Sequence, residues 1–182
     1  MKMKSLPKIA LAVMIAGVGV STVSTKAEAA TVKPVETTKA VVDLIDSTYK
    51  TLSKIVNDTI DQIDRKKEGH RKEDDVLNAL VQMRQKYNKE HNAIGSFLYQ
   101  KQNKGLKLTT TERNQLYNAN KNAYNNTLSS LNMLEAKIRK TSARSYGDFG
   151  KIKDNMLESI QKDKNAAVRD YEIVKTNIGK AK

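Results

Sequence analysis

Two histidines, His70 and His91, are the first candidates for chemistry in this chain, because it contains no cysteine. His70 lies three residues before Glu73, a spacing at which two side chains on one helix can share a metal ion. Gly69 precedes His70, however, which predicts a turn there, and no third ligand is evident. Glu90 and His91 are sequence neighbours and point in different directions on a helix. We therefore expect neither a metal nor a cofactor.

The remaining motifs of enzyme chemistry are also missing from the chain. It has no glycine-rich phosphate loop, no G-x-S-x-G and no H-E-x-x-H. The lack of cysteine excludes a disulfide framework, a thiolate metal site and a cysteine nucleophile. We expect no catalytic residues and a protein that is not an enzyme.

Basic residues cluster where the first and third of the expected helices end. If both ends lie at one pole of the molecule, they form a candidate anion-binding pole with these members: Arg65, Lys66, Lys67, Arg71, Lys72, Lys137, Arg139, Lys140 and Arg144. Such a pole could bind wall teichoic acid, anionic lipid or an acidic host surface. Alternatively, these are ordinary solvated helix ends, because cations favour the C-terminal end of the helix dipole.

A second candidate surface is a row of amides in the third expected helix. Asn114, Asn118, Asn122 and Asn125 recur at i, i+4, i+8 and i+11, which places them on one face. Neutral amides both donate and accept hydrogen bonds, so this face suits a protein interface. The alternative is a bias toward asparagine in the chain as a whole.

A third candidate is a polar layer inside the fold. Tyr49, His91 and Tyr124 reach one level when the expected helices are aligned from a common pole. Because histidine changes charge near neutral pH, this layer could be a buried switch or a ligand site. The plainer alternative is a hydrogen-bonded layer that sets the helix register.

The elements that must position these residues are four amphipathic helices. Apolar residues with 3-4 spacing predict helix starts near residues 37, 72, 109 and 149. The seams pass through Tyr49 in the first helix, Leu77 and Leu80 in the second, and Tyr124 in the third. Thr109 and Glu112 form a capping box at the start of the third helix.

Short links between long helices favour one fold class. We expect an all-α, up-down-up-down four-helix bundle over residues 37–182. The alternative is a three-helix bundle with a detached first helix.

Residues 1–29 carry the three-part pattern of a secretory signal peptide. Lysines at 2, 4 and 8 precede an uncharged run over 9–20, and Ala27 and Ala29 supply the small residues that signal peptidase requires. A run of this length is too short to span a membrane, which takes about 20 residues. We expect cleavage after Ala29, followed by a flexible arm over residues 30–36.

The formal net charge of +13 therefore belongs only partly to the secreted chain. Residues 1–29 contain four lysines and one glutamate, so ten of these charges remain. A secreted protein without cysteine fits a Gram-positive exporter better than an oxidising compartment. Nucleic acid is an unlikely partner, because basic residues are not interleaved with exposed aromatic side chains.

The export signal Met1–Ala29, the Lys- and Asn-rich surface and the cysteine-free helical body resemble the small secreted all-helical proteins of staphylococci and related Gram-positive bacteria. Several of these are helical bundles that bind host complement, coagulation or matrix proteins. The resemblance implies a secreted, non-enzymatic protein, a virulence or immune-evasion factor that engages a host or extracellular protein through a helical face. The alternative is an envelope-associated protein, held loosely at the cell surface by its basic poles on teichoic acid or another polyanion.

Overall fold

The computed structural model describes residues 37–65, 69–142, 144 and 150–181. The expected signal peptide with Ala27 and Ala29, and the expected arm over residues 30–36, lie outside the described residues. So do Lys66 and Lys67 of the candidate anion-binding pole. All four helices belong to one unit of the chain, residues 32–182.

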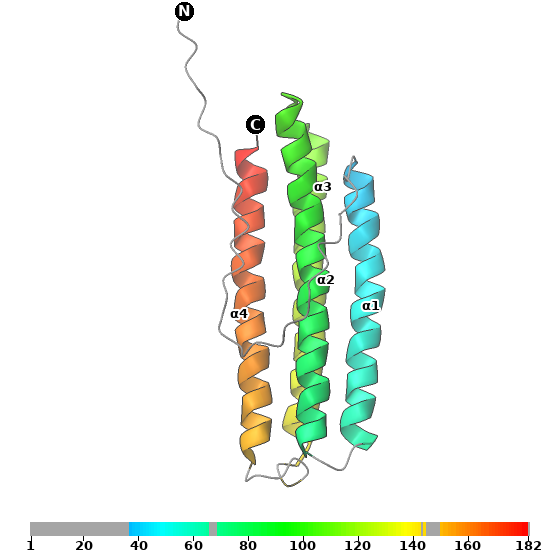
Figure 1. Cartoon of the computed structure of the whole chain (residues 1–182). Coiled ribbons are helices and arrows are strands. Elements are labelled where there is room, and N and C mark those ends of the chain that lie inside the picture. The colour runs from blue at the N-terminus through cyan, green and yellow to red at the C-terminus, as the bar shows by residue number, and fades with distance from the viewer. Residues whose placement is uncertain (1–36, 66–68, 143, 145–149, 182) are drawn as a thin grey trace, which may run out of the picture. The chain divides into compact units, whose positions relative to one another are not determined.

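Four long helices make up the described part of the chain, which contains no strand. They are α1 (Thr38–Arg65), α2 (Gly69–Asn103), α3 (Thr110–Lys140) and α4 (Lys151–Lys180). Successive helices run in opposite directions (Figure 1). The expectation of an all-α four-helix bundle is confirmed. None of the described helices is long and apolar enough to cross a membrane.

The helices do not pack in the order in which the chain visits them. α1 packs against α2 and α3, and α4 packs against the same two helices. α1 and α4 consequently lie on opposite sides, with α2 and α3 between them (Figure 1). Since α1 has two neighbours, the alternative of a detached first helix is wrong.

Capping residues and glycines define several of the helix ends. The Thr109 side chain accepts a hydrogen bond from the Glu112 backbone N–H at 3.1 Å, and the Thr109 backbone N–H donates to the Glu112 carboxylate at 2.9 Å. The predicted capping box is therefore confirmed. Gly105 (φ +64°) and Gly150 (φ +86°) adopt the left-handed conformation next to helix ends, where a side chain would add strain. Gly69 is the first residue of α2 rather than a spacer after α1.

The buried apolar side chains form two clusters along the bundle. The first apolar cluster surrounds the end of α1 and the starts of α2 and α4: Leu52, Val56, Ile63, Val76, Leu80, Met83, Leu131, Leu134, Ile138, Ile152, Met156 and Ile160. The second apolar cluster occupies the other end: Val41, Ile45, Tyr87, Ile94, Phe97, Leu108, Leu116, Ala119, Ala123, Ala167 and Ile178.

In α1 and α2, the buried face is rotated by about one residue from the face that the sequence predicts. Tyr49 is 43% exposed and Leu77 is 38% exposed, while their neighbours Thr48 and Val76 are buried. The apolar stripes in these helices are wider than the contact that each helix makes. Which edge of the stripe is buried therefore depends on the angle at which the neighbouring helix approaches.

Candidate functional site

Polar side chains separate the two apolar clusters. Thr48, Thr127 and Asp163 are buried on α1, α3 and α4, each between residues of the first and the second cluster. On α2, Arg84 follows Met83 of the first cluster and precedes Tyr87 of the second. We call Thr48, Arg84, Thr127 and Asp163 the polar belt.

An ion pair joins α2 to α4 in this belt. Arg84 Nε donates to Asp163 Oδ1 at 2.6 Å, and the Arg84 side chain is half exposed whereas Asp163 is buried. Burial raises the pKa of Asp163, although the hydrogen bond and the charge of Arg84 oppose that rise. The guanidinium thus compensates a carboxylate that the fold has largely removed from water.

Two further hydrogen bonds end on α4, one helical turn apart. The Tyr87 hydroxyl of α2 donates to the Ala167 carbonyl at 3.0 Å. The Asn120 side-chain amide of α3 donates to the Tyr171 carbonyl, also at 3.0 Å. The Tyr124 ring stacks on that of Tyr171, with centroids 4.9 Å apart. These contacts set the height of α4 relative to α2 and α3.

Glu90 and His91 are the titratable groups most affected by this environment. Glu90 is fully buried, and neither carboxyl oxygen has a hydrogen-bond partner among the described residues. Burial raises the pKa of Glu90 to about 8. Burial also lowers the pKa of His91 to about 4, with the charge of Asp170 opposing the shift. Near neutral pH the carboxyl is therefore protonated and the imidazole is neutral.

The prediction that Tyr49 belongs to a buried layer with His91 and Tyr124 is wrong. His91 and Tyr124 are partly buried, but Tyr49 is exposed and does not belong to the core. Glu90, which the sequence places beside His91, was not predicted to lie in the core, yet it is buried. Its signal was present, because Glu90 lies three residues after Tyr87 and four before Ile94, both of which are core residues.

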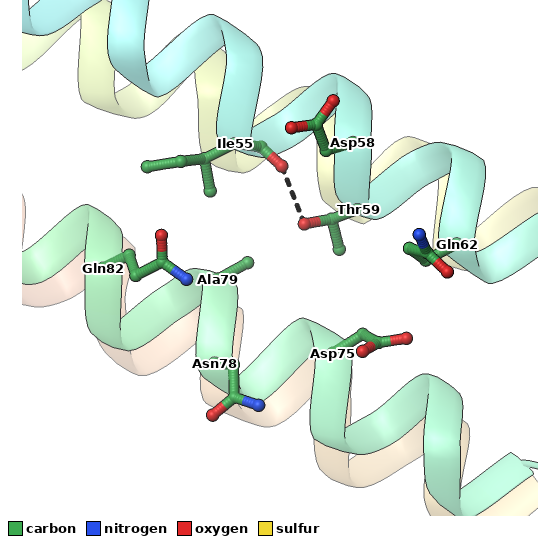
Figure 2. Close-up of a pocket in the computed structure, with 8 residues that line it drawn as sticks. All are labelled: Ile55, Asp58, Thr59, Gln62, Asp75, Asn78, Ala79 and Gln82. Carbon is green, nitrogen blue, oxygen red and sulfur yellow. Dashed lines mark hydrogen bonds between the residues drawn. The ribbon is translucent and has the colours of Figure 1, made fainter.

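A shallow polar groove runs between α1 and α2 (Figure 2). Its lining consists of these residues: Ile55, Asp58, Thr59, Gln62, Asp75, Asn78, Ala79 and Gln82. Thr59 and Ala79 are small and buried, which leaves space between the two helices there. The Thr59 hydroxyl donates to the Ile55 carbonyl at 2.7 Å. The groove thus offers amides and carboxylates, which suits a polar or cationic side chain from a partner. The sequence did not single it out.

The ends of α1 and α3 meet at one pole, as the expected up-down-up-down topology requires. Lys137 pairs with Asp64 at 2.5 Å, which joins the last turns of α3 and α1. Arg139 pairs with Glu135 at 2.6 Å, and Arg65 lies 3.9 Å from Asp61. Three basic residues of the pole are therefore already paired with carboxylates of the protein itself.

The remaining described members of the pole differ in exposure. Lys72 is buried, Arg71 is exposed, and both take part in interactions within the protein. Lys140 and Arg144 are exposed. The pole is consequently less free for an outside anion than its number of basic residues suggests.

The amide row on α3 lies on the surface. Asn114, Asn118, Asn122 and Asn125 are all exposed, and none makes a side-chain hydrogen bond to another described residue. Between Asn114 and Ala136, Lys121 is the single charged residue among the exposed positions of this helix. Lys121 lies on the same face, between Asn118 and Asn125, so this face consists of amides with one positive charge.

Neither a metal site nor a similarity to known proteins indicates a function for the described residues. No group of three or more His, Asp or Glu side chains in the described part of the chain could hold a metal ion. The sequence matches no protein-family model, no curated protein and no solved structure. The function must be argued from the surfaces themselves.

Proposed function

We propose that this protein is a secreted, non-enzymatic binding protein, a virulence or immune-evasion factor that engages a host protein through the amide face of α3. The observation that carries this proposal is the exposed row Asn114, Asn118, Asn122 and Asn125, whose amides are not used within the described structure. Burying a neutral amide against a hydrogen-bonding partner avoids the large desolvation cost of burying a charge.

The four-helix framework supports this use of α3. α3 contacts α1 and α4 through its buried side, so its outer face is held straight while remaining accessible. A rigid face loses little conformational entropy on binding, which favours affinity. The groove between α1 and α2 provides a second place for a partner's polar side chains.

Retention of a plasma protein on the immobilised full chain at physiological salt is the first test. We expect a retained protein whose affinity falls at least tenfold when Asn122 and Asn125 are both replaced by lysine. Matched controls are Asn57→Lys on α1 and Asn92→Lys on α2, which add the same charges at exposed positions elsewhere. Failure to retain any protein, or an equal loss in the controls, would contradict the proposal.

A second candidate function is attachment to an anionic envelope polymer through the basic pole. Exposed Arg65, Lys140 and Arg144 favour it. Counterion-driven binding weakens steeply with salt, so washing cells at about 0.5 M salt would release the protein. Lys140→Gln with Arg144→Gln would lower the salt needed. A protein interface at the amide face should survive that wash.

A further inference from the structure

Glu90 places an ionisable group in the middle of the second apolar cluster. Its neighbours in the α2 seam are Tyr87 and Ile94, both of which are buried. Glu90 itself has no exposed surface, and both of its carboxyl oxygens are buried without a hydrogen-bond partner among the described residues. An ionised carboxylate in such a place carries a heavy desolvation penalty, whereas a protonated carboxyl carries much less.

Glu90 makes no ion pair with a described residue. Lys86 lies one helical turn before it on α2 and is partly exposed, but burial is the single cause of the raised pKa of Glu90. On α2, the Arg84 side chain is held by Asp163 of α4, and burial keeps His91 neutral. The ionisable groups of α4 next to this region are Asp170 and Tyr171, whose charges act on Tyr87.

The other two helices also face this region with uncharged groups. α3 contributes Tyr124 and the amide of Asn120. Thr59 of α1 and Ala79 of α2 line the same groove, and the two helices are antiparallel. Buried Thr48 therefore lies near the level of Glu90, because each is eleven residues further along its helix from the groove. Asp46, Tyr49 and Lys50, the titratable residues of α1 around that level, are exposed.

We propose that Glu90 is a proton-dependent latch of the bundle: its protonated carboxyl lets the second apolar cluster close, and its ionisation loosens the packing of α2 at this level. The α2 members of the first apolar cluster are Val76, Leu80 and Met83, none of which titrates, so this cluster stays packed. The inference concerns the core and does not depend on the proposed surface of α3.

The direction of the pH effect follows from linkage. Burial raises the pKa of Glu90 from 4.5 to about 8, so between these values the folded protein binds more protons than the unfolded chain. Stability therefore falls as pH rises through this window, and the loss is complete above about pH 8. A protein working near neutral pH lies on the slope, where a small change in pH alters the fraction of loosened molecules.

Chemical denaturation of the full chain and its Glu90→Gln variant between pH 6.5 and 9 tests the latch. The amide resembles the protonated carboxyl and does not titrate. We expect the unfolding equilibrium constant of the wild type, divided by that of the variant, to rise about tenfold per pH unit and to level off above about pH 8. Glu172→Gln on the exposed side of α4 is the matched control, and its ratio should stay constant. A constant ratio for Glu90→Gln as well would overturn the proposal.

Hydrogen exchange on the unmodified protein gives a second test that needs no variant to fold. After correction for the intrinsic effect of pH, backbone amides over residues 87–97 should exchange at least tenfold faster at pH 8.5 than at pH 6.5. Amides over residues 76–83 in the first cluster should accelerate by no more than the rise in the global unfolding constant measured by denaturation, and amides over residues 87–97 by more than that rise. If residues 87–97 accelerate no more than the global constant, Glu90 does not control local opening.

Discussion

Two threonines at core positions differ in how their hydroxyls are satisfied. Thr59 Oγ1 donates to the Ile55 carbonyl at 2.7 Å, whereas Thr127 Oγ1 is buried without a hydrogen-bond partner among the described residues. An unsatisfied buried hydroxyl costs about 1–3 kcal/mol of stability. At the residue scale, the polar belt therefore lowers the free energy of unfolding.

Replacing Thr127 by valine should remove this cost while keeping the shape of the side chain. We expect Thr127→Val to raise the free energy of unfolding by about 1 kcal/mol in urea denaturation. Thr59→Val, which removes a satisfied hydroxyl, is the matched control and should be neutral or slightly destabilising. If Thr127→Val proved as unfavourable as the control, the buried hydroxyl would have to be satisfied.

His91 should make the protein sensitive to acid. Its pKa is about 4 in the folded protein and 6.5 ordinarily, so the unfolded chain binds more protons between these values. The stability that neutral His91 contributes is therefore fully present above about pH 6.5 and is lost as the pH falls toward 4. We expect His91→Gln to lose at least about 1 kcal/mol less than the wild type between pH 6.5 and 4.5, since one pKa unit corresponds to about 1.4 kcal/mol. Unfolding curves at the two pH values measure this, and equal losses would contradict it.

At the scale of the element, α2 buries only part of its apolar stripe. Leu77 and Leu80 both fit the apolar pattern, yet Leu80 is fully buried and Leu77 lies near the surface. Truncating a buried leucine removes transfer energy and leaves a cavity, whereas truncating a surface leucine does neither. Leu80→Ala should cost about 2–5 kcal/mol and Leu77→Ala less than about 1 kcal/mol in chemical denaturation. Equal costs would mean that the seam is rotated toward the face predicted from the sequence.

The C-terminal end of α4 depends on one side chain of α3. Arg113 Nη1 donates to the Ile178 carbonyl at 2.9 Å, and Arg113 Nη2 donates to the Ala181 carbonyl at 2.7 Å. The planar guanidinium thus caps carbonyls that would otherwise lack helical partners. We expect Arg113→Ala to lower stability by about 1–3 kcal/mol and to accelerate hydrogen exchange in the last turn of α4. Arg139→Ala, whose exposed guanidinium pairs within its own helix, should have a much smaller effect.

For the whole molecule, two apolar clusters held apart by polar groups imply ordinary stability. The belt includes an ion pair and an unsatisfied hydroxyl, and the formal net charge of +13 adds self-repulsion. We expect thermal unfolding well below 90 °C in circular dichroism, and a higher midpoint in moderate salt because the repulsion is screened. A midpoint above 90 °C would contradict this view of the core.

Much of the fold could be predicted because its signals are local. The 3-4 spacing of apolar residues indicated four helices, and Thr109 with Glu112 marked the start of α3. The short links made successive helices antiparallel. The amide row on α3 was also predictable, because four residues at helical spacing share a face wherever the helix lies.

Other features depended on which helices become neighbours. Tyr49 and Thr48 were both acceptable at the edge of a wide stripe, and the approach of the neighbouring helices buried Thr48. The groove between α1 and α2 exists because Thr59 and Ala79, far apart in the sequence, are small where the two helices meet.

The sequence alone therefore determined the four helices, the start of α3 and the relative directions of the helices, since hydrogen bonds and side-chain spacing within each segment set these. Only the tertiary structure decided that Glu90 is buried without a charged partner and that Lys137 is paired with Asp64. The physical reason is that burial and electrostatic pairing depend on distances between helices. Packing sets those distances, and no single segment contains them.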